Sequence, residues 1–404
     1  MAVGEAVFPQ MPVIAGVRLG TAQAGIKKAG RRDVAIIEVS ERARVAGVFT
    51  RNAFCAAPVQ IAKRHLQRQA SRYLLINTGN ANAGTGTQGM RDAQACCAAL
   101  AQLADVDDHN VLPFSTGVIG ERLPVDRLCD SLPEAMANLD DSAAAWQLAG
   151  EAILTTDTRP KGASATCDID GQTVTINGIA KGSGMIKPNM ATMLAFVATD
   201  ADIESTLLDS LLRNSVDRSF NCITIDSDTS TNDACMLIAT GEGASVVSEA
   251  SVAAFREALD AVMRELAQAI IRDGEGATKF VTLDVQGALS RDEALNVAFT
   301  VAHSPLVKTA LYASDANWGR ILAAVGRAPV EDFDVERVTI DLGDVRLVES
   351  GGRAPGYTEE AGSAVMARDE IDIRIILGRG DAAATVWTSD LSHGYVSINA
   401  DYRS

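Results

Sequence analysis

Residues 180–199 read AKGSGMIKPNMATMLAFVAT, a glycine-rich run that turns into an apolar one. The first part is typical of a loop with unusual backbone angles, and residues 193–197 are typical of a β-strand. A Walker A loop is excluded, because no lysine precedes a serine or threonine at the end of the loop. A GxGxxG dinucleotide loop is excluded as well, since Gly184 is followed by Met-Ile-Lys-Pro and not by the start of a helix. The stretch therefore predicts another kind of loop that leads into a strand.

Thr192 stands where this loop passes into the strand. One chemically demanding use of a threonine here is as a new chain N-terminus, whose own α-amine activates the hydroxyl as a nucleophile. An α-amine has a pKa of about 7.7 to 8.0, so near neutral pH it can act as the general base that histidine supplies in other enzymes. The alternative is an ordinary strand residue whose hydroxyl caps a neighbour, and spacing alone favours that alternative.

The length and charge of the chain limit what kind of protein it can be. At about 150 residues per domain, 404 residues predict two or three structural units, and 47% apolar residues supply their cores well. The net charge of −16 disfavours nucleic acid and anionic membrane surfaces as partners. The sequence shows neither about 18 uninterrupted apolar residues nor the basic start of a signal peptide, so we expect a cytoplasmic protein.

Cysteine and histidine offer few sites for disulfide or metal chemistry. The seven cysteines include no CxxC pair and lie mostly in apolar runs, which indicates buried thiols in a reducing compartment. Only four histidines are available for a general base or a zinc cluster. We therefore expect no metal and no resident cofactor.

Strand-like and helix-like stretches alternate irregularly along the chain. We expect strands at residues 72–76, 110–114, 280–285 and 371–377, and helices at residues 90–103, 252–271, 296–302 and 318–325. A hairpin is expected to turn at Asp170 and Gly171, and residues 77–84 and 115–120 are expected to form turns. Few βαβ spacings are present, so the pattern predicts an α/β fold of the layered α+β type rather than a doubly wound sheet.

Further blocks, in order along the chain, carry a resemblance to a known family. They are residues 25–27, 46–52, 56–59, 77–83, 115–120, 155–158, 226–233, 273–279, 314–320 and 388–393. Together with residues 181–194, they resemble the glutamate N-acetyltransferase family of arginine biosynthesis, also called the ornithine acetyltransferase family. One departure is the final Ser404, where threonine is also common, but serine keeps the hydroxyl group and the terminal carboxylate.

The resemblance implies an enzyme that processes itself. Members of the family have a layered α/β fold of their own type, similar in active-site logic to N-terminal-nucleophile hydrolases, and they cut themselves before a threonine. Carried to this chain, the cut falls between Ala191 and Thr192. It yields an α-chain, residues 1–191, and a β-chain, residues 192–404, whose strands and helices share one core. An α2β2 heterotetramer is the expectation for the assembly.

The implied activity moves an acetyl group from N-acetylornithine to glutamate in two half-reactions. The Thr192 hydroxyl takes the acetyl group as an ester and ornithine leaves, and glutamate then takes the group to give N-acetylglutamate. Thr116 and Gly117 match the oxyanion-hole positions of the family, through a hydroxyl and a backbone N–H in a strand-to-turn context. Use of acetyl-CoA as a second donor varies within the family, and these residues do not decide it.

Other positions match those that bind the substrates in the family. We expect Lys181 to hold a carboxylate of the substrate and Glu275 to pair with the side-chain ammonium of ornithine. The remaining matching positions are Thr155, with Thr156 beside it, Thr192 itself, Asn399 and Ser404. Taken singly, each of these residues is more readily a surface or turn residue, and the ordered set is what points to a site.

Several conspicuous residues have simpler structural explanations. His393, Trp318 and the group Asp226, Asp228 and Asp233 are expected to pack and to order loops, rather than to form a triad, a stacking platform and a metal cluster. Two other functions stay open. One is a related self-processing aminopeptidase or amidase, which passes the acyl group to water. The other is a non-catalytic, oligomeric metabolite-binding protein, which would stay one uncut chain.

Overall fold

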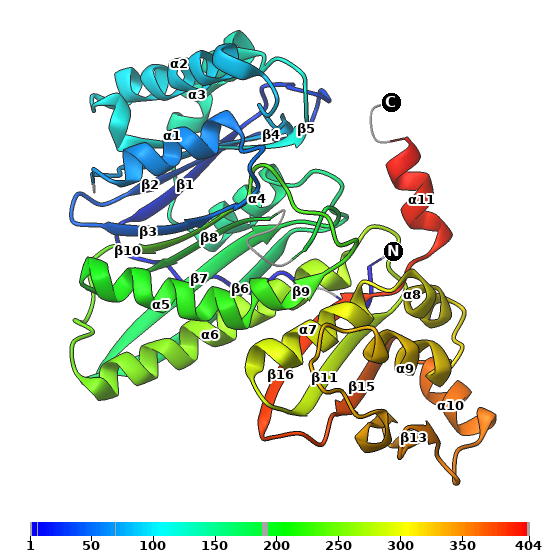
Figure 1. The fold of residues 1–404 in the computed structure, drawn as a ribbon. Helices are drawn as coiled ribbons and strands as arrows, with labels where there is room; N and C mark the ends of the chain where they lie inside the picture. The colour runs from blue at the N-terminus through cyan, green and yellow to red at the C-terminus, as the bar shows by residue number, and fades with distance from the viewer. Residues whose placement is uncertain (1, 6, 69, 188–192, 402–404) are drawn as a thin grey trace. The chain divides into compact units, whose positions relative to one another are not determined.

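Strands and helices alternate along the chain, and they gather into two compact units. The computed structural model (Figure 1) describes residues 2–5, 7–68, 70–187 and 193–401. The larger unit consists of Ala6–Asn221 and Asp228–Ile270, and the smaller unit of Met1–Glu5, Cys222–Ser227 and Ile271–Ser404. Two units agree with the number that the chain length predicts.

A four-stranded sheet forms one strand layer of the larger unit. Its order is β1-β2-β4-β5, in which β4 and β5 are parallel and the other neighbours are antiparallel. The strands are β1 (Val17–Ala22), β2 (Val34–Val39), β4 (Tyr73–Asn80) and β5 (Val111–Val118). Helices α2 (Gly86–Ala104) and α3 (Val125–Ala137) cover its outer face, where Cys97 and Leu132 are fully buried (Figure 1).

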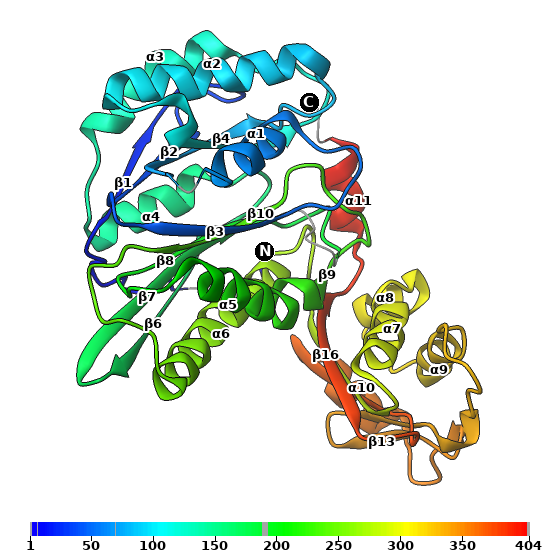
Figure 2. The same cartoon turned by 60° about the vertical axis from the view of Figure 1, so that its left-hand side comes forward.

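A five-stranded sheet forms the other strand layer, in the order β3-β10-β8-β7-β6. β8 and β10 are parallel, and the other neighbours are antiparallel. The strands are β3 (Arg44–Phe49), β6 (Lys161–Ile169), β7 (Gln172–Lys181), β8 (Leu194–Thr199) and β10 (Ala234–Ala239). Helices α5 (Ser205–Arg218) and α6 (Glu249–Arg272) cover the outer face of this sheet (Figure 2).

The two sheets bury one hydrophobic core between them. Leu74 and Phe114 of the first sheet and Phe196 and Met236 of the second belong to the same buried cluster, and the two phenylalanine rings lie edge to face with centroids 5.1 Å apart. Helix α4 (Ala143–Ala152) packs on β1 and β7, and α1 (Ala57–Leu66) packs on β5 and β3. Helices α2, α3, α5 and α6 thus cover the outer faces of the two sheets, and α1 and α4 each contact strands of both, which confirms the predicted layered α/β class.

Strands from both sides of residue 192 alternate in the five-stranded sheet. β8 and β10 follow this residue in the sequence, whereas β3, β6 and β7 precede it. Leu194 of β8 pairs with Lys181 on one side and with Ala234 on the other. Both segments therefore build one core, as predicted. The boundary between the compact units does not fall at residue 192, and the cut there stays a prediction about one peptide bond.

A seven-stranded sheet forms the smaller unit, in the order β14-β13-β12-β15-β11-β16-β9. The strands are β9 (Ile223–Thr224), β11 (Phe280–Ala288), β12 (Thr339–Leu342), β13 (Val345–Glu349), β14 (Gly352–Arg353), β15 (Glu370–Ile376) and β16 (Ala382–Ser389). β11 is parallel to β15 and β9 to β16, and the other neighbours are antiparallel.

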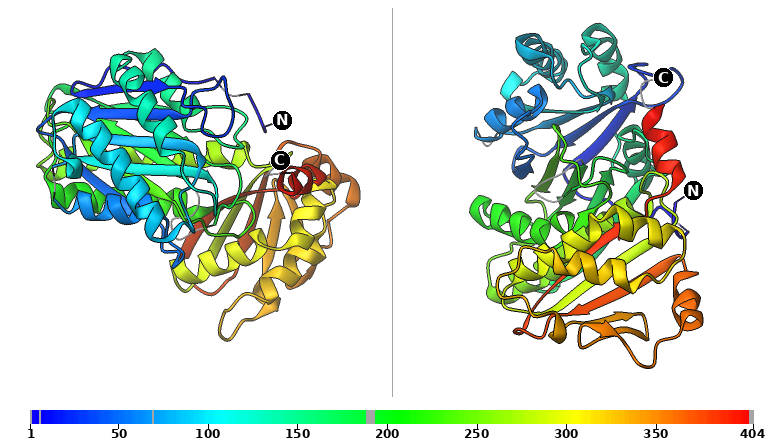
Figure 3. Two further views of the ribbon diagram at one scale, coloured as in Figure 1. Left: turned by 90° about the horizontal axis from the view of Figure 1, so that it is seen from above. Right: turned by 45° about the vertical axis from the view of Figure 1, so that its right-hand side comes forward.

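Helices cover one face of this seven-stranded sheet, where α7 packs on β11 and β16 (Figure 3, right). The helices of the unit are α7 (Arg291–Ala302), α8 (Pro305–Tyr312), α9 (Trp318–Gly326), α10 (Glu359–Met366) and α11 (His393–Ala400).

Short 3-10 turns of the chain lie at Asp108–Asn110, Phe220–Cys222 and Val335–Arg337. Among the helices of the described residues, none combines the length and the hydropathy that a membrane span needs.

Most local predictions agree with these elements, and two do not. The predicted hairpin turns at Asp170 and Gly171, whose φ angles are +52° and +80°. The turns predicted at residues 77–84 and 115–120 are wrong in part, because β4 continues to Asn80 and β5 to Val118. The reason is close strand contact: Gly79 and Gly117 lie opposite each other, and a Cβ on Gly117 would lie 2.3 Å from the Gly79 carbonyl carbon.

Candidate functional site

The last residue of β7, Lys181, lies beside the beginning of β8. It stands opposite Leu194, which follows Thr192 by two positions in the sequence, and it is buried. Three predicted site residues, Ala191, Thr192 and Ser404, lie outside the described residues. The described part of the site in the larger unit is therefore the set of side chains around the end of β7.

The Lys181 ammonium group brings two other predicted residues together. Its Nζ donates to Thr155 Oγ1 at 2.6 Å and to Thr116 Oγ1 at 3.3 Å. Thr155 follows α4 and Thr116 lies in β5, so three separate elements supply these groups. A hydroxyl that accepts a hydrogen bond keeps its own hydrogen for another acceptor. The Thr116 hydroxyl can therefore donate to a substrate oxygen while Lys181 holds it in place.

A buried carboxylate, Asp157, holds this cluster together, and the sequence did not single it out. Its Oδ1 accepts from Lys161 Nζ at 2.6 Å and from the Gly182 N–H at 2.7 Å. Its Oδ2 accepts from the Thr155 N–H at 3.0 Å and lies 3.8 Å from Lys181 Nζ. Burial alone would raise the pKa of Asp157, but the two ammonium groups hold that pKa well below its usual range. The carboxylate therefore stays ionised and fixes Thr155 and Lys181 relative to each other.

The hydroxyl of Thr156 also meets the loop after β7. Its Oγ1 lies 2.7 Å from Ser183 Oγ, so the two hydroxyls form a hydrogen bond in which either can be the donor. Residues 155–157 are thus bonded to the end of β7 and the loop after it, through the hydroxyls of Thr155 and Thr156 and through the Asp157 carboxylate, which accepts from the Gly182 N–H. The available sequence signal was an aspartate within the Thr-rich block, followed four positions later by a lysine.

Thr116 and Gly117 lie inside β5 and not in a turn, which corrects the predicted context. The φ angle of Gly117 is +135°, a conformation that favours glycine, and Gly117 pairs with Gly79 of β4. The cause is the close strand contact described above. Because the backbones of β4 and β5 are paired here, Thr116 has a defined place in the sheet, as the predicted oxyanion-hole role requires of a hydrogen-bond donor.

The turn before β10 connects the beginning of β8 with β5. Asp233 Oδ1 accepts from the Met193 N–H at 3.0 Å. Asn232 Nδ2 donates to the carbonyl oxygens of Ala81 and Ser115, at 2.7 and 2.9 Å. Asp233 thus orders the local chain, as predicted, but the segment it orders adjoins Thr192, which the sequence did not indicate. The available signal was a pair of polar residues directly before an apolar strand.

Two further predicted residues meet in the smaller unit. Glu275 lies in the loop after α6, and Asn399 lies in α11. Asn399 Nδ2 donates to Glu275 Oε2 at 2.7 Å and to the Tyr395 carbonyl oxygen at 3.0 Å. Since Asn399 bonds one of the two carboxylate oxygens, the pair presents an oriented carboxylate of the kind that an ammonium group binds.

The residues expected to be structural have local partners. The His393 ring lies edge to face with a tyrosine ring at a centroid distance of 5.7 Å, and Trp318 packs against the core of the smaller unit. Asp226 Oδ2 accepts from a tyrosine hydroxyl at 3.2 Å, and Asp226 and Asp233 belong to different compact units. Within the described ranges, no three side chains of histidine, cysteine, aspartate or glutamate are grouped as a metal site requires.

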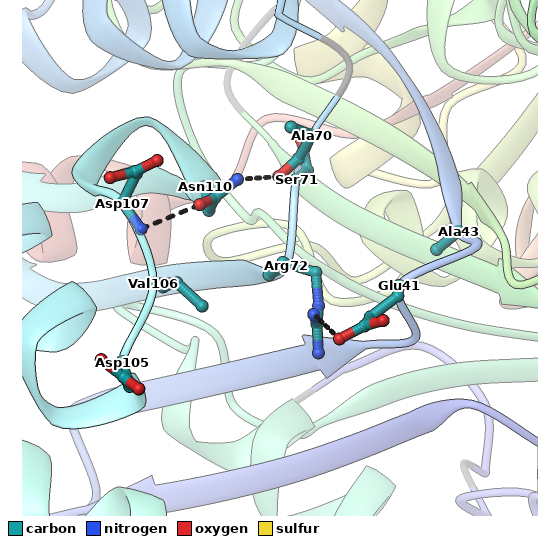
Figure 4. Close-up of a pocket in the computed structure, with 9 residues that line it drawn as sticks. All are labelled: Glu41, Ala43, Ala70, Ser71, Arg72, Asp105, Val106, Asp107 and Asn110. Carbon is teal, nitrogen blue, oxygen red and sulfur yellow. Dashed lines mark hydrogen bonds and ion pairs between the residues drawn. The ribbon is translucent and has the colours of Figure 1, made fainter.

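A surface pocket of about 560 Å³ in the larger unit contains none of these site residues (Figure 4). Its polar side chains bond to their neighbours: Arg72 Nη1 lies 3.0 Å from Glu41 Oε1, and Asn110 Oδ1 accepts from the Asp107 N–H at 2.9 Å. Because these groups already satisfy one another, we place the candidate site at the end of β7 and not in this pocket.

Comparison with known proteins agrees with the family resemblance that the sequence blocks indicate. Residues 18–404 match the ArgJ family. The chain is 58% identical to the arginine biosynthesis bifunctional protein ArgJ of Methylococcus capsulatus, over 97% of this chain and 96% of that protein. It is 55% identical to the protein of the same name from Pseudomonas fluorescens over the full length of both.

A solved structure is similar to part of the chain. It is the crystal structure of the arginine biosynthesis bifunctional protein argJ from Bacillus halodurans, with 39% sequence identity and a TM-score of 0.50. The match covers 52% of this chain and 99% of that one.

Proposed function

Because this chain belongs to the ArgJ family, we propose that it is an acyltransferase of arginine biosynthesis that moves an acetyl group from N-acetylornithine to glutamate. One observation carries the proposal: Thr116, Thr155 and Lys181 converge beside β8, which begins two residues after Thr192. Acyl transfer to a threonine needs hydrogen-bond donors for the oxyanion and a charged group that binds the substrate. The Thr116 hydroxyl and the Lys181 ammonium group can supply these close to the beginning of β8.

The chain first cuts itself between Ala191 and Thr192. The Thr192 hydroxyl attacks the Ala191 carbonyl carbon, the C–N bond breaks, and the nitrogen takes up a proton, so that Ala191 is joined to Thr192 Oγ as an ester. Water then hydrolyses the ester, which restores the hydroxyl and leaves Ala191 with a free carboxylate. The products are an α-chain, residues 1–191, and a β-chain, residues 192–404, with the new amine on the nucleophile itself.

Acetyl transfer uses the same hydroxyl with this amine as the base. Thr192 Oγ attacks the acetyl carbonyl carbon of N-acetylornithine while the amine takes its proton, and ornithine leaves with a proton on its nitrogen. The amine of glutamate then attacks the ester and forms N-acetylglutamate. In both halves the oxyanion receives hydrogen bonds from the Thr116 hydroxyl and the Gly117 N–H, each of which stabilises a transition state by several kcal/mol, on the order of 3.

The substrate groups are distributed over side chains of opposite charge. Lys181 supplies the positive charge for a substrate carboxylate, and its Nζ holds the hydroxyl oxygens of Thr116 and Thr155 beside it. Glu275, oriented by Asn399, takes the side-chain ammonium of ornithine. Ser404 contributes its hydroxyl.

Acetyl-CoA is a second donor in this proposal, and no resident cofactor or metal is required. The relatives carry the word bifunctional in their names. We place the enzyme in the cytoplasm, as an α2β2 heterotetramer. The competing self-processing amidase would pass the acetyl group from Thr192 to water, so the two functions differ in the acceptor and not in the nucleophile.

The test is the substitution Thr192→Ala. We expect the variant to stay a single chain of 42.4 kDa, whereas the unmodified protein gives two fragments on a denaturing gel, the second with Thr192 as its N-terminus. Acetyl transfer to glutamate is expected to be lost in the variant. In the unmodified protein, N-acetylglutamate formation measured against acetate release separates transfer from hydrolysis.

A matched control is Thr199→Ala at the other end of β8, which removes a buried hydroxyl that accepts from the Ala201 N–H at 3.3 Å. We expect this variant to cut itself and to transfer acetyl groups. Full activity in an uncut Thr192→Ala chain would refute the nucleophile.

A further inference from the structure

Met193, the residue that follows the nucleophile, is held at both of its backbone groups by the start of β10. Its N–H donates to Asp233 Oδ1 at 3.0 Å, and its carbonyl oxygen accepts from the Ala234 N–H at 3.1 Å. The N–H in question belongs to the peptide bond between Thr192 and Met193. The contact with Asp233 is therefore one covalent step from the nucleophile.

The side chain of Asp233 accepts a hydrogen bond from the chain before β8, a role that backbone carbonyl oxygens have further along the strand. The Asp233 carbonyl oxygen is turned toward β3, where it accepts from the Thr50 N–H at 3.0 Å. It is engaged on the β3 side, so the acceptor on the β8 side is the carboxyl group. The parallel β8–β10 pairing begins at Leu194 and Ala234, and Oδ1 extends it by one residue toward Thr192.

The surroundings of the second carboxyl oxygen of Asp233 favour the protonated, neutral form of the side chain. Oδ2 is fully buried and has no hydrogen-bond partner among the described residues, and no lysine or arginine there forms an ion pair with it. Burial raises the pKa of Asp233 well above its usual range. The Met193 N–H opposes this rise, as do the hydroxyls of Ser230 and Thr50 and the charge of Lys181, but burial outweighs them. A charged carboxylate at this position would lose its hydration without an ion pair to replace it.

The same turn also fixes the proposed oxyanion-hole strand. Asn232 Nδ2 donates to the carbonyl oxygen of Ser115, the residue before Thr116, at 2.9 Å. Consecutive side chains, Asn232 and Asp233, thus hold β5 and the start of β8. Their joint position sets the distance between the Thr116 hydroxyl and the chain at Met193.

We propose that Asp233, in its neutral form, is a positioning residue for self-cleavage and acetyl transfer: through Oδ1 it fixes the amide that joins Thr192 to Met193. The inference rests on Thr192 being the nucleophile. Asp233 acts through this amide and has no contact with substrate in the proposal. Because a misplacement of about 1 Å can cost about 100-fold in rate, losing this one bond has a large effect on the reaction.

Two substitutions test the proposal. Asp233→Asn keeps the acceptor oxygen and the shape but has no charge, so we expect cleavage within about threefold of the unmodified rate and the same pH profile. Asp233→Leu removes the acceptor, and we expect cleavage to slow about 100-fold. Hydrogen exchange of the Met193 amide gives a readout that does not depend on activity: protection is expected in the Asn variant and lost in the Leu variant.

Asp200 offers a matched control at the opposite end of β8. Its Oδ1 accepts from the Thr175 N–H of β7 at 2.9 Å, and burial raises its pKa as well. Asp200→Asn and Asp200→Leu are expected to cleave at the unmodified rate, which separates positioning of the nucleophile from general weakening of the sheet.

The outcomes are distinct from those of the function itself. If folded Asp233→Asn fails to cleave, the neutral form is wrong, and if Asp233→Leu cleaves normally, positioning is wrong. Either result leaves the nucleophile intact as long as Thr192→Ala stays uncut and the unmodified chain cuts. If the unmodified chain does not cut at Thr192, the proposed function falls, and the amide protection of Met193 still reports whether Asp233 holds it.

Discussion

One buried carboxylate between two buried ammonium groups determines the geometry of the site. The side chains of Asp157, Lys161 and Lys181 are 0%, 1% and 4% exposed. Charges this deeply buried are stable only as a bonded set, because each alone would lose its hydration without compensation. Loss of Asp157 would therefore leave two uncompensated charges and release Thr155 and Lys181 from each other.

The substitution Asp157→Asn is expected to lower the free energy of unfolding at pH 7 by roughly 3–5 kcal/mol. The measurement is urea denaturation in the uncut Thr192→Ala background, so that one chain unfolds. The folded-state pKa of Asp157 lies below the unfolded value of about 3.9, so its charge contributes stability above that pH, and the contribution is lost as the pH falls toward the folded pKa. The difference between the two chains should therefore shrink below about pH 4.

An exposed ion pair serves as the control for this prediction. Asp209 and Arg213 lie one turn apart on α5, with side chains 43% and 58% exposed. Asp209→Asn is expected to change the free energy of unfolding by about 0.5 kcal/mol or less, since water screens the pair. If both variants lose the same free energy of unfolding, burial of the Asp157 cluster does not increase its contribution to stability.

At the scale of elements, the contact between β4 and β5 determines where Thr116 lies. The two parallel strands pair Thr78 with Thr116 and Gly79 with Gly117. No side chain separates the backbones at the second pair, so the strands approach closely there. The same contact explains why the turn expected at residues 115–120 is a strand: glycine suits a turn and a close strand contact equally, and the sequence alone does not separate the two.

The substitution Gly117→Ala tests this contact. A Cβ there would lie 2.3 Å from the Gly79 carbonyl carbon and 2.5 Å from the Asn80 nitrogen, and alanine is strained at a φ of +135°. Because the strands must separate, we expect the kcat/KM of acetyl transfer to fall about 100-fold. Strain alone is expected to lower the free energy of unfolding by about 1–3 kcal/mol.

Gly120→Ala is the matched control for the strand contact. Gly120 also has a positive φ, +84°, but a Cβ there meets no atom within 4 Å. Only backbone strain is expected, about 1 kcal/mol, with acetyl transfer near the unmodified rate. Equal activity of the two alanine variants would contradict a role for the close approach of β4 and β5.

At the scale of the whole molecule, the five-stranded sheet connects the two expected chains. β8 of the β-chain is hydrogen-bonded to β7 of the α-chain, and β3 of the α-chain pairs with β10 of the β-chain. Side chains of β8 such as Ala195 and Val197 are fully buried in this sheet. Cleavage at one peptide bond removes none of these contacts.

We therefore expect the two fragments to stay together after cleavage. Native mass spectrometry or size-exclusion chromatography without denaturant should show one complex that contains both fragments, and urea should separate them. The uncut Thr192→Ala chain, run in parallel, is expected to elute at the same volume. Fragments that separate in native buffer would show that the sheet does not hold them.

The sequence by itself determined what depends on neighbouring residues and on family motifs. The hairpin at Asp170 and Gly171 and the apolar face of α6 follow from local turn chemistry and helical spacing. The family blocks indicated Thr116, Thr155 and Lys181 as members of one site, and the structure brings these three together. Local propensity and ordered motifs carry this information without any knowledge of the tertiary contacts.

Only the tertiary structure decided which distant groups touch and which charges persist. Lys181 meets Thr116 across 65 positions of sequence, because β5 and β7 belong to different sheets that pack on each other. Asp157 is held ionised and Asp233 has a raised pKa, although both are fully buried aspartates. The difference lies in their partners: two ammonium groups lie close to Asp157, whereas Asp233 forms no ion pair among the described residues, and the Met193 N–H and nearby hydroxyls only partly offset its burial. Burial and partners arise only when distant segments close around a residue, so no local pattern encodes the charge that each aspartate keeps.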